Sequence, residues 1–424
     1  MPTVGKLLVD TGPLRNYPEF RRLWTGLAIS SIGSQLAVVA IAIEVYDLTK
    51  SSLDVGLISL VQLLPALVGS IVGGAIADAI DRRKLLICTG VSMSACAAGL
   101  AINAGSRHPT LWLIYVLAAL SAGLQGCDGP ARVAVLLSIV DKDSIVAANA
   151  LRQLLAQISL VLGPAIGGVL ISIFNVRVVF IVNAASFLVA VMTVLTISSH
   201  LPLGGATRFG WRSISEGFEF LKGRQAIQGC FVADLNATIL GMPTALFPAL
   251  AVGQFHGGSR IAGLLYAAPG AGALVCSGFS GWTKAIRRPG YAVCVSIVVW
   301  GVALAGFGLA KWLPLALVLL AIAGGADVIS AVFRSTIIQT EAPDRLRGRI
   351  SSIQQAVVTA GPRLGNAEAG FVAALSSNQI SVVSGGLGCI VGIALVARLM
   401  PRFVRYELGR DEHETAGEAS PAAS

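Results

Sequence analysis

Stretches of about 20 residues with almost no charge recur along the whole sequence, and each is long enough to cross a hydrocarbon core of roughly 30 Å as an α-helix. Of the 424 residues, 55% are hydrophobic and only 12% are charged. Soluble domains carry about 25% charged residues, so this chain lacks the polar surface that water requires. We therefore predict an all-α integral membrane protein that crosses the lipid bilayer many times.

The apolar windows between charge clusters predict twelve membrane-spanning helices. The residues before the first window contain no sustained apolar run, so we expect no cleaved signal peptide. The windows lie near residues 23–47, 55–77, 85–105, 111–131, 145–173, 178–197, 228–252, 260–282, 291–310, 313–333, 349–375 and 381–400.

Lys and Arg are distributed unevenly between the two sides of these helices. With a cytoplasmic N-terminus, 25 of the 31 basic residues fall on the cytoplasmic side, five fall in outer loops, and Arg363 lies inside a span. An excess of basic residues in cytoplasmic loops sets membrane orientation. We therefore expect both termini in the cytoplasm of a bacterial inner membrane. The net charge of +9 then reflects topology and requires no nucleic-acid partner.

The two halves of the chain resemble each other. GPAIGG at 163–168 is echoed by GPRLGN at 361–366, and Asp128 on the fourth window corresponds to Asp327 on the tenth. A parallel repeat of six spans is typical of transporters whose substrate site lies between the repeats. The predicted architecture is two six-helix pseudo-repeats, residues 1–197 and 228–401.

Two segments lie outside the predicted repeats. Residues 198–227 form a cytoplasmic linker with an amphipathic stretch, WRSISEGFEFLKGR. Residues 402–424 form a cytoplasmic tail whose last part is rich in Ala, Ser, Gly and Glu, a composition that cannot bury a core. We expect this tail to be disordered beyond about Gly409 and dispensable for transport.

The stretch GGAIADAIDRRKLL, residues 73–86, concentrates charge between the second and third windows. It resembles the loop signature of the major facilitator superfamily, G-x-L-A-D-R-x-G-R-K-x-x-L, while Ala79 and Asp81 depart from that signature. The resemblance extends over about residues 15–405 and implies the twelve-span transporter fold. The matching positions are Gly74, Ala77, Asp78, Arg82, Arg83 and Leu86.

A second resemblance concerns the direction of transport. The motif G-x-x-x-G-P-x-x-G-G of exporters in this superfamily is matched on the fifth window, with Ser159 at its first glycine and Gly163, Pro164, Gly167 and Gly168 at later positions. LRNYPEFRRLW, GLLYAAPGAGALVCSGFSGW and IIQTEAPDRLRGRI are similar to the bacterial enterobactin-exporter and Tap-like multidrug efflux branch. This branch implies proton-driven export of a drug-like compound or a siderophore. The alternative is a metabolite or sugar importer of the same fold.

The charged loop has two interpretations. In the superfamily, the aspartate at the position of Asp78 meets the N-terminal end of span eleven, here near Arg347–Ile350, when the cytoplasmic side is shut. Arg82 would then reach an acid of the same gate. Under the simpler interpretation, these charges only hold the hairpin in the cytoplasm. Asp128, one helical turn before Arg132, is predicted as a gate partner of this loop, with proton carriage as the alternative.

Acidic side chains inside the predicted spans are the candidate coupling residues. A charge at the bilayer centre costs about 2.5–3.5 kcal/mol on insertion scales, so a retained acid indicates function. The family resemblance implies that spans seven and ten, with Asp234 and Asp327, line the central cavity. We also predict Arg363 and Glu368 on span eleven as cavity residues. They lie five positions apart, a spacing that directs the two side chains away from each other. Glu44 and Asp47 are expected at the outer interface.

Small residues and cysteines have simpler interpretations. The seven cysteines lie within apolar windows and form no CxxC pair, which indicates packing rather than a metal site. We expect no cofactor, no enzymatic activity and a monomer. Glycines spaced by four allow close helix packing in lipid, and such pairs are Gly69 and Gly73, Gly163 and Gly167, and Gly361 and Gly365.

Overall fold

The computed structural model describes residues 10–198, 219–278 and 286–407. Most of the predicted amphipathic stretch and the tail beyond Gly409 lie outside these residues. All the regular elements in the described part are helices, as the sequence predicts. The first half contains α1 (Gly12–Asn16), α2 (Pro18–Thr49), α3 (Ser52–Ala79), α4 (Arg82–Ala104), α5 (Leu111–Ser138), η2 (Lys142–Ser144), α6 (Ile145–Ile173) and α7 (Val176–Leu195).

The second half repeats this pattern of long helices. One span is interrupted at Gly241, so that α9 (Gln225–Leu240), η3 (Pro243–Leu246) and α10 (Phe247–Gly253) together cover the length of one crossing. The remaining helices are α11 (Ser259–Gly278), α12 (Pro289–Leu309), α13 (Leu313–Glu341), α14 (Asp344–Leu375), α15 (Asn378–Leu399) and α16 (Pro401–Val404).

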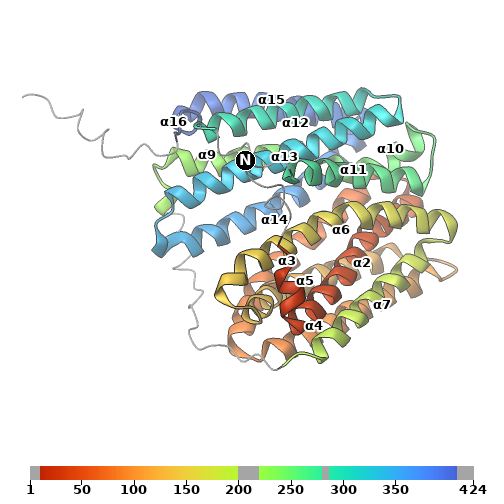
Figure 1. Cartoon of the computed structure of the whole chain (residues 1–424). Helices are drawn as coiled ribbons and strands as arrows, with labels where there is room; N and C mark the ends of the chain where they lie inside the picture. The colour runs from red at the N-terminus through yellow and green to blue at the C-terminus, as the bar shows by residue number, and fades with distance from the viewer. Residues whose placement is uncertain (1–9, 199–218, 279–285, 408–424) are drawn as a thin grey trace, which may run out of the picture.

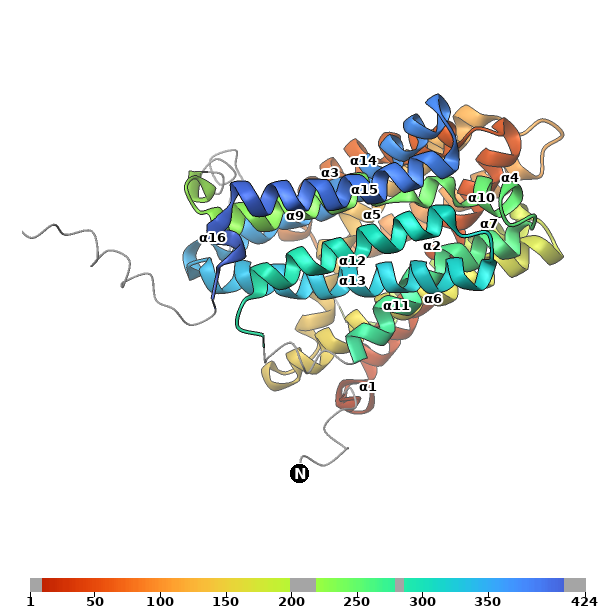
Figure 2. The same ribbon diagram turned by 90° about the horizontal axis from the view of Figure 1, so that it is seen from above.

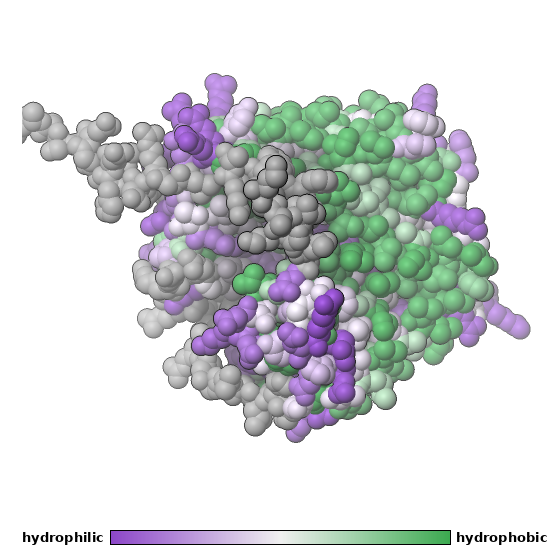
Figure 3. Space-filling model, in the orientation of Figure 1, coloured by the Kyte–Doolittle hydropathy of each residue, from purple (hydrophilic) through white to green (hydrophobic). Residues whose placement is uncertain are grey.

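Eleven helical segments of the described chain are long and apolar enough to cross a membrane. The predicted eleventh span, α14, is not among them, although it is 32 residues long and packs along α3. Its composition explains the difference, because Arg363 and Glu368 interrupt its apolar run and further charges crowd its first turns. In Figure 3, a broad apolar belt crosses the molecule, with hydrophilic residues gathered toward its ends.

Figure 1 shows α2 to α7 on one side of the molecule and α9 to α15 on the other. The turned view in Figure 2 shows the long helices running side by side. Helix α3 packs on α14, and α6 packs on α11, so these pairs join the two groups. The division of the chain at residues 198–227 stays a prediction.

Local sequence signals explain where several helices begin. Ser51, Asp81, Asn175 and Ser377 cap α3, α4, α7 and α15, each accepting a hydrogen bond from a backbone N–H in the first turn. Such caps satisfy donors that have no partner within the helix. Asp81, which departs from the superfamily signature, thus has a structural role at the start of α4. Lys50, with φ of 53°, makes the tight turn between α2 and α3.

Close contacts between the two groups of helices gather at the ends predicted to face outside. A Cβ on Gly56 of α3 would meet the backbone of Asn366 on α14, and a Cβ on Gly168 of α6 would meet the backbone of α11. The Ser52 hydroxyl donates to the Asn378 side chain at 2.8 Å. The halves are therefore held together at this end by backbone-to-backbone packing that larger residues would prevent.

Candidate functional site

Three charged residues form an ionic cluster between α9 and α13. The guanidinium of Arg334 lies 2.8 Å from Asp234 Oδ1 and 4.0 Å from Asp327 Oδ1. The side chains of Asp234 and Arg334 are each only 6% exposed, whereas that of Asp327 is 44% exposed. We call these three residues the α9–α13 cluster. One cation therefore serves two carboxylates of unequal exposure.

Helical geometry places the two α13 residues of this cluster, Asp327 and Arg334, on one face of that helix. Asp327, Ser330 and Arg334 are spaced i, i+3 and i+7, which aligns them along a helix. The Ser330 hydroxyl accepts a 2.8 Å hydrogen bond from Arg334 Nη1 and so holds the guanidinium toward α9. Burying a charge in a low-dielectric interior is costly unless it is paired and hydrogen-bonded. Arg334 and Asp234 satisfy each other, while Asp327 keeps the weaker contact and the access to solvent.

The corresponding acid in the first half has a different environment. Asp128 receives two hydrogen bonds from Arg132, at 2.6 and 3.1 Å, and one from the Thr89 hydroxyl at 2.9 Å. The residue is 7% exposed. Such a two-point pair with an additional donor is strong and rigid. Asp128 therefore fixes α5 against α4, and its predicted contact with the loop at Arg82 stays a prediction.

The charged loop between α3 and α4 is anchored within the first half. Arg82 lies 3.9 Å from Asp78, and its Nε donates to the Ala77 carbonyl at 3.3 Å. Arg83 donates to the Leu195 carbonyl at the end of α7, at 2.6 Å. Asp78 keeps 42% of its side chain exposed. Gly74 has open space where a Cβ would lie, so close packing does not require a glycine there.

The exporter-type motif places α6 between α2 and α11. A Cβ on Gly163 would meet Gln35, and a Cβ on Gly167 would touch Leu36, both on α2. Gly168 instead faces Gly263 on α11, and Pro164 contributes its carbonyl to the same junction. The motif therefore permits close contacts on two sides of one helix.

Residues 10–413 match the family described as transmembrane secretion effector, within the major facilitator superfamily. The chain belongs to this family. An enterobactin exporter of Citrobacter koseri is 28% identical over 399 residues, which cover 94% of this chain and 96% of that relative. The protein is therefore a multi-pass membrane transporter, not an enzyme.

Solved structures of other transporters share the fold. A bacterial homologue of the human lysosomal transporter Spinster, titled as inward-facing and unoccupied, has a TM-score of 0.72 at 15% identity and covers 94% of this chain and 100% of its own. A POT family transporter in complex with 5-aminolevulinic acid has a TM-score of 0.74 at 11% identity and covers 94% and 99%. These similarities support the major facilitator fold of the chain.

Two further candidate residues, Arg363 and Glu368, lie on α14. Arg363 Nη1 donates to the Thr359 carbonyl at 2.9 Å, while its buried Nε has no hydrogen-bond partner among the described residues. Gly370, which packs against Ser52 of α3, lies seven positions after Arg363, so the two share a helix face. The Arg363 position therefore lies on the face of α14 that packs on α3. No ion pair in the described part joins it to Glu368.

The structure corrects the predicted placement of Glu44 and adds Arg334 to the candidate residues. Glu44, expected at the interface, is only 6% exposed, and neither carboxylate oxygen has a hydrogen-bond partner in the described part of the chain. Asp47, in contrast, is exposed and pairs with Lys50. Arg334 falls just beyond the predicted window 313–333, whereas α13 continues to Glu341. Its spacing from Asp327 and Ser330 was the signal that could have identified it.

No cluster of three potential metal ligands occurs among the residues that the structure describes. The α9–α13 cluster supplies two carboxylates and one guanidinium group. Carboxylates can exchange protons, and guanidinium groups can hold anions or carboxylates.

Asp78→Asn should shift the transporter toward states that are open to the cytoplasm, if Asp78 closes the cytoplasmic gate. The exposed pair with Arg82 contributes only about 0–1 kcal/mol. A partly buried contact with a helix N-terminus can reach about 2 kcal/mol, enough to shift a balanced equilibrium. Labelling of single cysteines at each end of α13, in a cysteine-free background, reports the ratio of states. Asp47→Asn, at an exposed acid on the opposite end, is the control. An unchanged ratio in Asp78→Asn would leave only the interpretation that the loop charges hold the hairpin in the cytoplasm.

Proposed function

We propose that the protein exports a small amphipathic molecule, of the siderophore class, from the cytoplasm by proton antiport. The observation that carries this proposal is the similarity to enterobactin exporters over 94% of the chain. The exporter-type motif on α6 supports the outward direction. Drug-like compounds remain a second substrate class, because a cavity assembled from many helices is not encoded by one motif.

Alternating access is the proposed mechanism. In the superfamily fold, two halves rock about a central site, and access changes sides. The contacts of Gly56 and Gly168 join the two groups of helices near the ends predicted to face outside. We expect this arrangement to receive substrate from the cytoplasm. Opening of the outer side would then require separation of α3 from α14 and of α6 from α11.

Proton coupling is assigned to the α9–α13 cluster. When Asp327 carries a proton, Arg334 has one anionic partner, Asp234, at 2.8 Å. When Asp327 is ionised, it competes for the same guanidinium across the present distance of 4.0 Å. Loss or gain of one proton at Asp327 therefore changes the electrostatic attraction between Arg334 on α13 and Asp234 on α9. Substrate bound beside Asp327 would compete with the proton, which is the requirement for antiport.

Efflux in cells tests the direction and the driving force together. Cells that make a siderophore, but lack their own exporter, should release it into the medium when they express this protein. A protonophore should stop release and raise the amount inside the cell, while the amount of folded protein stays constant. Uptake of an external metabolite in place of release would support the importer alternative. Release that is insensitive to the protonophore would exclude proton antiport.

A further inference from the structure

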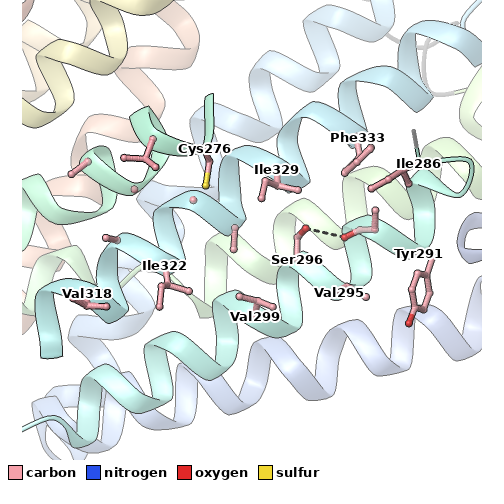
Figure 4. Close-up of a pocket in the computed structure, with 17 residues that line it drawn as sticks. Cys276, Ile286, Tyr291, Val295, Ser296, Val299, Val318, Ile322, Ile329 and Phe333 are labelled. Carbon is pink, nitrogen blue, oxygen red and sulfur yellow. Dashed lines mark hydrogen bonds between the residues drawn. The ribbon is translucent and has the colours of Figure 1, made fainter. Parts of the chain in front are cut away.

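An apolar groove lies between α11, α12 and α13, and none of the three residues of the α9–α13 cluster lines it. Its volume is about 840 Å³, within the range of ligand-sized pockets, about 300–1,000 Å³. Figure 4 shows Val318 and Ile322 at one end, with Phe333 and Ile286 toward the other. This groove is distinct from the site that we assign to coupling.

Small residues on two helices create the hollow. Gly272 on α11 packs against Ala321, and Gly325 on α13 packs against Cys276, so the floor of the groove carries little side-chain volume. Ser296 is one of the few polar side chains in the lining, and its hydroxyl donates to the Ala292 carbonyl at 2.9 Å. Because this donor is already satisfied, the groove favours a hydrocarbon occupant.

The groove opens to the surface that faces lipid. Val275, Tyr291 and Val318 are all exposed residues that line it. Phe333 lies fifteen positions after Val318 on α13, which corresponds to about 22 Å along the groove at about 1.5 Å per residue. One leaflet contributes about 15 Å of hydrocarbon, half of a core of about 30 Å. An acyl chain of one leaflet therefore fits along it.

Basic residues surround the end of the groove that we predict to face the cytoplasm. Arg287 is exposed and directly follows Ile286, which lines the groove. Helix α16 packs on the start of α12, where Gly290 meets Phe403, and brings exposed Arg402 to the same end. Arg288 also lies here and pairs with Glu407 at 2.8 Å. Among the described residues around this end are thus three cations, Arg287, Arg288 and Arg402, of which Arg288 is paired with Glu407.

We infer that the groove binds an anionic phospholipid of the cytoplasmic leaflet. One acyl chain lies in the groove between α12 and α13, and the phosphate lies beside Arg287. Basic side chains near the membrane surface attract anionic headgroups, and basic pockets between helices on the cytoplasmic side hold them. The apolar groove and the adjacent cations thus match the two parts of one molecule.

Lipid retention by the purified full-length protein tests this inference. Native mass spectrometry in mild detergent should show dioleoyl phosphatidylglycerol retained more tightly than dioleoyl phosphatidylcholine. Arg287→Gln should weaken phosphatidylglycerol binding about fivefold, which corresponds to about 1 kcal/mol for one basic residue near the surface. Ile322→Trp, which fills the groove from an exposed position, should remove binding of both lipids.

Matched variants keep these results specific. Lys311→Gln removes the same charge from an exposed position at the opposite end of α13, and Val391→Trp adds the same ring to an exposed position on α15. Both should retain lipid as the unmodified protein does. Equal retention of the two lipids, or equal retention by Ile322→Trp and Val391→Trp, would overturn the inference. Displacement of phosphatidylglycerol by the exported molecule would also overturn it, because the groove would then be a substrate portal.

Discussion

Protonophore-sensitive efflux should fall about 5- to 150-fold in Asp327→Asn, while the yield of folded protein stays unchanged. This range corresponds to loss of a typical coupling free energy of about 1–3 kcal/mol between two sites. Asn keeps the shape of the side chain but cannot bind and release a proton. Because Asp327 is 44% exposed and 4.0 Å from Arg334, its loss leaves the tighter pair with Asp234 intact. Binding and downhill exchange should therefore partly survive.

Two companion variants separate coupling from folding. Asp327→Glu keeps a titratable carboxyl and should recover part of the active efflux. Asp234→Asn should also lower active efflux, and it should lower the yield because Arg334 then loses its partner at 2.8 Å. Efflux and yield are measured together in the same membranes. Full proton-driven efflux in Asp327→Asn would remove this residue from the mechanism.

Arg334→Met should destabilise the protein strongly. The substitution preserves much of the side-chain volume but leaves Asp234 as a buried carboxylate without its cation. Removing one partner of a buried ion pair costs about 3–5 kcal/mol. The midpoint of thermal unfolding in detergent and the fraction of monodisperse protein should both fall. The effect should exceed that of any other single substitution considered for this chain.

An exposed pair of the same length provides the control. Arg288 lies 2.8 Å from Glu407, but its side chain is 64% exposed. Arg288→Met should therefore change stability by no more than about 1 kcal/mol. The double substitution of Asp234→Leu with Arg334→Met should recover much of the lost stability, because an apolar pair can replace a buried ion pair. A normal unfolding midpoint in Arg334→Met alone would mean that Asp234 is neutral in the folded protein.

Local patterns in the sequence determined much of the architecture. Apolar windows predicted the long helices because the burial of about 20 residues in hydrocarbon depends on composition alone. The glycine pairs predicted close packing, and the structure places Gly69 and Gly73 against α5. Family motifs indicated a transporter. Composition identifies α14 less clearly as a membrane span, because charged residues such as Arg363 and Glu368 lower its mean hydropathy.

Only the tertiary structure decided which charges meet. Asp234 and Arg334 are 100 positions apart, and nothing in either window encodes the rotation and depth that bring their side chains to 2.8 Å. For the same reason the sequence did not predict the burial of Glu44, which lies near the end of a span but is only 6% exposed. Hydropathy reports how far a helix extends through the membrane. Pairing depends on which faces of different helices pack together, and that is a property of the whole bundle.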